Sequence, residues 1–146
     1  MKLMNSHDYN VTAWLLMLSA LALHVLDEAL SGFLPFYNQM VLNLRTKLGF
    51  FPAPTFSHGL WLGGLVAVIT AGFMLTPWVK RESKAVRIFT LVLGVLMVAN
   101  ALGHLLGSLY AGRVLPGMWS SPLLLITAGY VVYRGIAGQW SYEQNR

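Results

Sequence analysis

Six side chains with polar or ionisable groups interrupt the apolar stretches of this sequence or stand at their edges: His24, Asp27, Glu28, His58, Asn100 and His104. An ionisable group inside a membrane segment is energetically costly, so such groups normally face the bundle interior and have partners. Imidazole and carboxylate groups together form a nitrogen and oxygen ligand set, which suits zinc, or iron or manganese where two ions bind. The same groups can act as general acids and bases. These residue types therefore predict a metal site or a site of proton chemistry.

The spacing of these residues places most of them on shared helix faces. His24 lies four residues before Glu28 and three before Asp27, and Asn100 lies four residues before His104. Residues three or four apart stand on one face of an α-helix. Asp27 and Glu28 diverge by about 100° around the helix axis, so at least one of them points partly sideways. The pattern predicts one polar face on each of two helices.

The composition is that of a membrane protein. Of 146 residues, 56% are hydrophobic and only 10% are charged, and the mean hydropathy is +0.60. A soluble domain carries about 25% charged residues. The net charge is +5, but the basic residues form no patch on a polar domain, so we expect no nucleic-acid partner. The absence of cysteine excludes disulfides and thiolate metal sites.

Four apolar stretches are long enough to cross a bilayer, which takes about 20 residues. They cover residues 11–30, 57–79, 85–110 and 119–136. The first continues past the small-residue triplet Ala20-Leu21-Ala22, so we expect a retained helix rather than a cleaved signal peptide. We therefore predict an all-α fold, an integral membrane four-helix bundle that forms a single transmembrane domain over residues 1–146.

A short amphipathic helix is predicted between the first two spans. From residue 36 to residue 48, apolar side chains recur at helical spacing, with Asn, Gln, Arg and Lys on the opposite side. Such a helix lies in the membrane interface. Gly32 and Pro35 separate it from the first span, and a Pro-Ala-Pro segment ends it before the second. Its position would allow it to act as a lid over the polar residues.

Basic residues in the loops predict the orientation. With an even number of spans, both termini and the second loop share one side of the membrane. That side holds seven basic residues and the other holds three: Lys2, Lys80, Arg81, Lys84, Arg87, Arg134 and Arg146, against Arg45, Lys47 and Arg113. We therefore expect cytoplasmic termini and a location in the cell (inner) membrane.

This orientation also predicts the depth of the polar residues. A helix rises about 1.5 Å per residue, so His24, Glu28, Asn100 and His104 lie roughly 19 to 28 Å from the cytoplasmic side. The hydrocarbon core is about 30 Å thick, so all four fall in its outer half. His58 begins the second span at the same side. Residues from three helices are thus expected in one layer.

Two glycine pairs accompany the histidines. Gly59 and Gly63 follow His58, and Gly103 and Gly107 flank the later histidine, each pair with GxxxG spacing. Such pairs let helix backbones approach closely. We expect them either to bring polar side chains of neighbouring helices into contact or simply to reflect the glycine-rich composition of membrane helices.

The residues quoted above resemble a known family. His24-Val25-Leu26-Asp27-Glu28 is similar to the defining motif of the HXXEE-domain proteins, which are small membrane proteins of bacteria and fungi. The segment Asn100-Ala101-Leu102-Gly103-His104, followed by Pro116-Gly117, is similar to the second half of that family's pattern. The resemblance extends over residues 14–130 and implies a membrane protein with no established activity. Asp27 stands where the family name implies a glutamate, which is one methylene longer.

Three functions fit these residues. In the first, a divalent metal, zinc before iron or manganese, binds the following set: His24, Glu28, His58 and His104. With an open coordination position, such a site could hydrolyse a lipid-like substrate, with Glu28 or Asp27 as general base. The catalytic candidates are Glu28, Asp27 and Asn100.

The second function is metal-free acid–base work, in an isomerase acting on a lipid-like substrate or in a proton-coupled transporter. The third is structural, in which the polar side chains bond to one another only to fix helix packing. We favour the metal site and keep the other two as alternatives.

Overall fold

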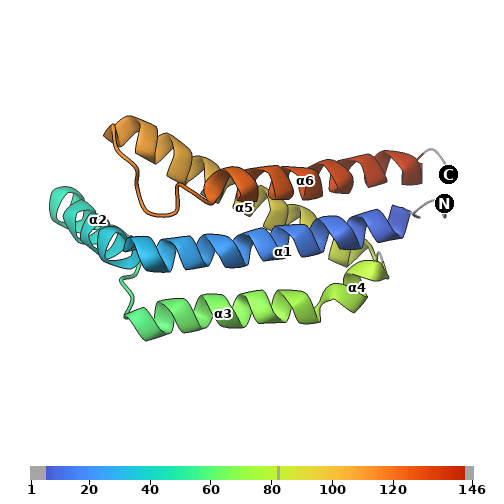
Figure 1. Ribbon diagram of the computed structural model, residues 1–146, viewed down its shortest axis with the longest axis horizontal. Helices are drawn as coiled ribbons and strands as arrows, with labels where there is room; N and C mark the ends of the chain where they lie inside the picture. Colours follow the sequence, from blue (N-terminus) through green and yellow to red (C-terminus); the bar gives the residue numbers. More distant parts are fainter. Residues whose placement is uncertain (1–5, 82, 144–146) are drawn as a thin grey trace.

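The computed structural model describes residues 6–81 and 83–143, and all regular structure within them is α-helical, which confirms the all-α prediction. The elements are α1 (Ser6–Ser31), α2 (Phe33–Leu48), α3 (His58–Met74), α4 (Thr76–Lys80), α5 (Lys84–Ala111) and α6 (Ser121–Glu143). In Figure 1, α1 runs between α3 and α6, while α5 crosses behind them. The start of α1, the α4–α5 connection and the end of α6 lie at the same end of the bundle.

Membrane character rests on the length and composition of these helices. Within the described residues, three stretches are long and apolar enough to cross a membrane: Asn10–Ser31, His58–Lys80 and Lys84–Ala111. The apolar part of α6, Ser121–Ala137, is shorter. The chain thus has three candidate spans, and the fourth span and the interfacial position of α2 stay predictions.

The second predicted span, over residues 57–79, is divided into α3 and α4 by a bend at Leu75. Pro77 lies in the first turn of α4, where its missing N–H costs no helical hydrogen bond. In an unbroken helix, Pro77 would leave the carbonyl of Phe73 without its usual donor. The hydroxyl of Thr76 donates to that carbonyl at 2.7 Å instead. Proline chemistry therefore explains the bend.

Two predicted helix starts shift for reasons of backbone geometry. The helix expected from residue 36 begins at Phe33, directly after Gly32, whose φ of 81° makes the turn out of α1. Pro35 therefore belongs to the first turn of α2 and does not separate it from α1. The helix expected from residue 119 begins at Ser121, because a loop with Gly117 at φ 83° precedes it.

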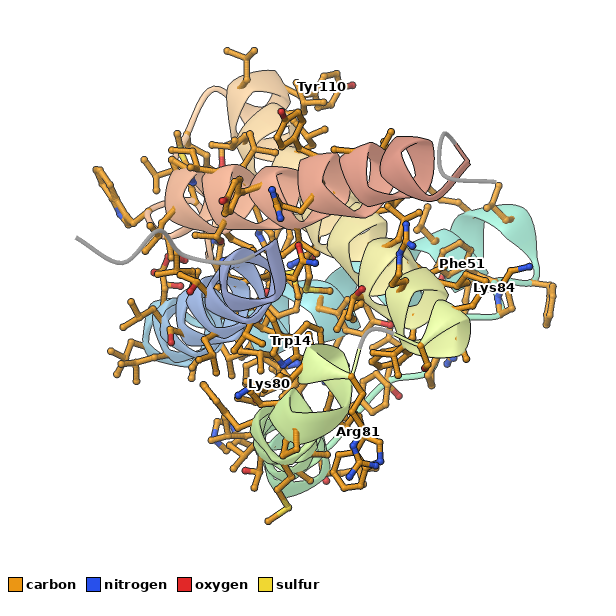
Figure 2. All side chains as sticks on the ribbon, turned by 90° about the vertical axis from the view of Figure 1, so that its right-hand side faces the viewer. Trp14, Phe51, Lys80, Arg81, Lys84 and Tyr110 are labelled. Atoms are coloured by element: carbon orange, nitrogen blue, oxygen red, sulfur yellow. The ribbon has the colours of Figure 1, made fainter. Side chains whose placement is uncertain are left out.

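The core forms around α1. Its buried residues Trp14, Met17 and Leu18 pack against Val79 of α4 and against Ala128 and Val131 of α6. Further along α1, a second cluster joins residues from four helices: Ala20, Leu21, Val25, Ile69, Ala101 and Leu124. Figure 2 shows Trp14 pointing inward between α1 and the α3–α4 pair. The second half of α1 is therefore enclosed by α3, α5 and α6.

Basic side chains gather where α4 meets α5. Figure 2 looks at this end of the molecule, where Lys80 of α4, Arg81 directly after it and Lys84 of α5 are labelled. All three are exposed. They belong to the seven basic residues predicted for the cytoplasmic side. Two others of that set, Lys2 and Arg146, lie outside the described residues.

Close helix contacts occur at glycines other than the predicted pairs. A Cβ atom would meet nothing within 4 Å at three of the four paired glycines: Gly59, Gly63 and Gly103. Of the two alternatives for these pairs, the three open positions favour the glycine-rich composition of membrane helices over close contact within the chain. The close approach is at Gly72, where a Cβ would lie 2.8 Å from the side chain of Leu18. The carbonyl of Gly72 also accepts a hydrogen bond from Trp14 Nε1 at 3.2 Å.

We predict that Gly72→Val destabilises the protein. Gly63→Val is the matched control, because Gly63 lies on the same helix with open space around it, and it should not destabilise the protein. Overpacking a well-packed contact costs about 1–3 kcal/mol. Thermal unfolding of the detergent-purified variants measures the difference. Equal melting temperatures for the two variants would show that α1 and α3 do not meet at Gly72.

Candidate functional site

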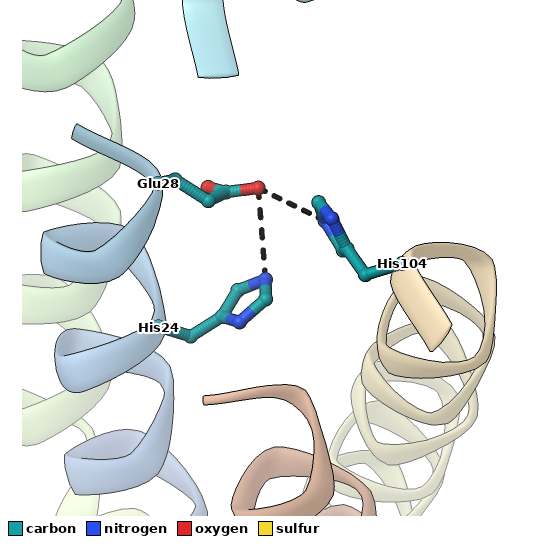
Figure 3. A group of neighbouring side chains, drawn as sticks. All are labelled: His24, Glu28 and His104. Atoms are coloured by element: carbon teal, nitrogen blue, oxygen red, sulfur yellow. Dashed lines mark ion pairs between the residues drawn. The ribbon is translucent and has the colours of Figure 1, made fainter. Parts of the chain in front are cut away.

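Three side chains converge at the end of α1 that is followed by α2. His24 and Glu28 come from α1, and His104 comes from α5 (Figure 3). Oε1 of Glu28 lies 3.6 Å from Nε2 of His24 and 3.0 Å from Nε2 of His104. The residues are only 0%, 5% and 9% exposed in the order His24, Glu28, His104. The group is therefore shielded from solvent. An unpaired charge in such a buried position is costly.

Ser120 and Asp27 determine which nitrogen of His24 carries a proton. Oδ2 of Asp27 accepts hydrogen bonds from Ser120 N at 3.0 Å and from Ser120 Oγ at 2.8 Å. Ser120 Oγ also lies 2.8 Å from Nδ1 of His24. The hydroxyl has one proton, which it donates to the carboxylate at 2.8 Å in preference to the Gly117 carbonyl at 3.3 Å, so it accepts from Nδ1–H. In the neutral ring, His24 Nε2 is then an acceptor, and Asn100 Nδ2 donates to it at 3.1 Å.

A backbone carbonyl has the same effect on His104. Nδ1 of His104 lies 2.7 Å from the carbonyl oxygen of Pro116, so Nδ1 must be the donor. In the neutral ring, Nε2 is then an acceptor and faces Glu28. Binding of one ring nitrogen to a carbonyl or carboxylate, which orients the other nitrogen, is the usual arrangement of metal-ligating histidines.

The loop between α5 and α6 holds this arrangement in place. Ser108 of α5 fixes the loop at its start, because its hydroxyl accepts from Leu115 N at 3.0 Å. Gly117, at φ 83°, turns the chain beside the site. A Cβ at Gly117 would lie 2.8 Å from the His104 ring and 3.1 Å from Glu28 Cγ. Only glycine fits here, for reasons of both backbone conformation and space.

The geometry therefore brings two imidazole nitrogens and a carboxylate oxygen to one place. Electron-rich atoms separated by 3.0 and 3.6 Å repel one another unless a proton or a cation lies between them. No lysine or arginine among the described residues forms an ion pair with Glu28 or Asp27. The positive charge must therefore come from protonation of the site or from a bound cation.

The distances suit a metal ion after a small inward movement. In a tetrahedral zinc site, metal–ligand bonds of about 2.0–2.2 Å place neighbouring ligand atoms roughly 3.3 Å apart. The two distances to Glu28 bracket that value. One ligand atom from each of the three side chains lies within 4.8 Å of the others, so the two rings would have to draw closer. His24, Glu28 and His104 can thus hold a metal ion.

The structure brings five of the six predicted site residues together. Glu28 faces α5 while Asp27 faces Ser120, as expected of neighbours that diverge around a helix. His58 does not join them. It is exposed at the start of α3, where its ring lies 6.0 Å from that of Trp61. His58 therefore lies outside the group of three metal-binding candidates.

An aromatic side chain packs against His104. The ring of Phe33, the first residue of α2, lies 5.3 Å from the His104 ring and 6.0 Å from the ring of Trp61. Tyr37 stacks on Phe33 at 5.9 Å. These contacts place the start of α2 beside the site and make this wall of the site apolar, while a lid role for α2 stays a prediction.

Sequence reasoning missed the groups that orient the histidines. Ser120 stands directly before α6 and looks like an ordinary helix cap, and the Pro116 carbonyl carries no side-chain signal. The Pro116-Gly117 pair could have drawn attention, but a pair of this kind usually marks only a turn.

A family model described as "Protein of unknown function with HXXEE motif" matches residues 14–132. The chain belongs to the HXXEE family. The match confirms the resemblance and includes His24, Glu28, Asn100, His104 and Ser120. No curated protein and no solved structure gives a significant match to the chain. In this HXXEE protein, Asp27 occupies the first acidic position of the motif and holds Ser120, while Glu28 faces both histidines.

We predict that Gly117→Ala disrupts the site more than Gly112→Ala. Both glycines have positive φ, 83° and 63°, so both substitutions cost about 1–2 kcal/mol of backbone strain. Only at Gly117 does the new methyl group strike His104 and Glu28, which adds about 1–3 kcal/mol. Thermal unfolding measures the total, and imidazole NMR signals report on His104. Similar spectra for the two variants would contradict this account of the loop.

Proposed function

We propose that this protein is an integral membrane metal-binding protein whose His24–Glu28–His104 group holds one divalent ion, zinc first. The observation that carries the proposal is the pair of Nδ1 hydrogen bonds, to Ser120 and to Pro116, which turns both Nε2 atoms toward Glu28. In neutral rings these two nitrogens and the carboxylate would all be acceptors, and a bound cation would stabilise such a set. The ion would replace the Asn100 amide, which donates to His24 Nε2. Neutral histidine nitrogens and a carboxylate are the ligands that zinc takes in catalytic sites.

The chemistry we propose for this centre is hydrolysis of a lipid-like substrate. Three protein ligands leave one position open, and an ion in such a site supplies Lewis-acid activation of water near neutral pH. Asn100 is half-buried beside His24, and its amide can orient a substrate carbonyl. The apolar wall at Phe33 and Trp61 favours a hydrophobic substrate over a charged one. We assign Asp27 the role of keeping Ser120 and His24 in position, because its Oδ2 accepts both hydrogen bonds of Ser120.

The membrane setting completes the proposal. We propose four spans, with α6 as the fourth, cytoplasmic termini and a location in the inner membrane. The basic residues around the α4–α5 connection favour this orientation, and the start of α1 and the end of α6 lie at that same end. The metal group lies toward the opposite end, so a substrate would enter from the outer leaflet.

Proton chemistry without a metal is the second candidate, and one distance favours it. Nε2 of His104 and Oε1 of Glu28 lie 3.0 Å apart, which is a normal hydrogen-bond length if one proton is shared between them. A His–Glu pair of this kind could serve an isomerase or a proton-coupled transporter. Metal content separates this candidate from the first.

We predict near-stoichiometric metal in the detergent-purified protein after incubation with zinc, measured by elemental analysis. Glu28→Gln and His104→Asn should lose it, because each removes a ligand at similar side-chain size. His58→Ala is the matched control: it removes an exposed histidine outside the group and should keep the metal.

Gel filtration and thermal unfolding check that each variant is folded. A folded wild-type protein that takes up no zinc, iron or manganese would exclude the metal centre and leave proton chemistry. Equal metal loss in His58→Ala would show binding elsewhere. Collapse of both ligand variants, with no metal in the wild type, would favour a structural role.

We predict that Asp27→Ala weakens metal binding roughly 10- to 100-fold, the usual effect of losing a group that orients a ligand. The N–H and the O–H of Ser120 both donate to the same oxygen of Asp27, which alanine lacks. Ser120 would then lose the acceptor that makes its hydroxyl receive the His24 proton. Zinc titration with a competing chelator measures the change. Unchanged affinity in a folded variant would show that Asp27 does not act through His24.

A further inference from the structure

A second polar site lies at the far end of α2. A pocket of about 330 Å³ is lined there by Arg45, Gly49, Phe50, Phe51 and Pro52. Arg45 is the only charged residue among these lining residues. It stands in the last turn of α2, twelve residues after Phe33 and roughly 18 Å further along the helix axis. The pocket is therefore separate from the metal group.

The hydrogen bonds of Arg45 leave one edge of its guanidinium group available. Nε donates to the carbonyl of Phe51 at 3.3 Å, and Nη2 donates to the carbonyl of Ala53 at 2.6 Å. Both donors belong to the same side of the planar group. The opposite edge, formed by Nη1 and the second Nη2 hydrogen, has no partner among the described residues. Two parallel N–H groups of this kind match phosphate oxygens.

The charge of Arg45 is also not neutralised. No carboxylate in the described part of the chain forms an ion pair with it, although its side chain is half-buried. Lys47 adds a second positive charge in the same turn of α2, and α2 contains no acidic residue. A half-buried cation supported only by carbonyl dipoles favours binding of an anion.

The pocket has an apolar border. Phe50 is 75% exposed and Leu48 is 65% exposed. They flank Gly49, whose φ of 75° ends α2 at the border of the pocket. Large apolar side chains next to basic ones are typical of segments that rest on lipid. The segment is firmly held, because Tyr37 donates to the Pro54 carbonyl at 3.0 Å. Arg45 is therefore not the only tether of this loop.

We propose that the Arg45 pocket binds a phosphate group, and that a lipid headgroup is its first source. The free guanidinium edge binds two phosphate oxygens, and Leu48 and Phe50 contact the acyl chains. The proposal is independent of the metal centre, since no residue is shared between the two sites.

The test measures ligand-induced stabilisation of the full chain in detergent. Melting temperatures are recorded with short-chain phosphatidylglycerol, with short-chain phosphatidylcholine and with inorganic phosphate. The variants are Arg45→Gln, Arg45→Lys and, as the matched control, Lys47→Gln, which removes the same charge from the same turn without altering the lining of the pocket. Glu28→Gln is included to test whether phosphate binds at the metal group instead. If it does not, the ligand should raise the melting temperature of Glu28→Gln as much as that of the wild type.

We expect phosphatidylglycerol to raise the melting temperature of the wild type, of Lys47→Gln and of Glu28→Gln, and to have no effect on Arg45→Gln. Arg45→Lys should respond more weakly, because an ammonium group cannot present two parallel donors. An equal response to inorganic phosphate would support the site and assign it to the free ion, whereas a response to phosphatidylglycerol alone assigns it to the headgroup. Equal stabilisation of Arg45→Gln, or none in the wild type, overturns the proposal. If Arg45→Gln does not fold, an undiminished response of Arg45→Lys overturns it.

Discussion

The site depends on one electrostatic constraint: two imidazole nitrogens and a carboxylate oxygen, all electron-rich, face one another out of contact with water. His24 and His104 cannot turn away, because their Nδ1 atoms are bound to Ser120 and to the Pro116 carbonyl. Water cannot screen the repulsion, because all three side chains are buried or nearly so. Something positive must balance them, and this requirement links the hydrogen bonds of one loop to the chemistry of the whole protein.

The rest of the fold supplies what this constraint requires. The long helices α1 and α5 bring the ligands, and the loop before α6 brings the groups that orient them. Gly117 allows the loop to approach, since any side chain there would displace His104. The Trp14–Gly72 contact fixes α3 against α1 in the apolar half of the bundle, away from the polar group. The residues of α1 that pack in the apolar core and the residues of α1 that form the polar group thus lie in different parts of the helix.

The arrangement of the acidic pair explains why two adjacent carboxylates are compatible with an apolar helix. Asp27 and Glu28 point in different directions, and each has its own partners. Asp27 is satisfied by the backbone and hydroxyl of Ser120, so its charge is used to position a histidine. Glu28 is left with two histidine nitrogens and is the group available to a cation. Adjacent positions in the motif therefore have separate tasks.

The sequence by itself determined the all-α fold, the approximate helices and the two polar faces, because hydrophobic length and helical spacing are local properties of the chain. It also predicted that His24, Glu28, Asn100 and His104 reach one layer. Only the tertiary structure decided that His58 stays outside, that α3 bends before Pro77 and that the helices meet at Gly72. It alone showed Ser120 and the Pro116 carbonyl, because a serine or a backbone carbonyl acquires a role only from the distant side chain that folding places beside it.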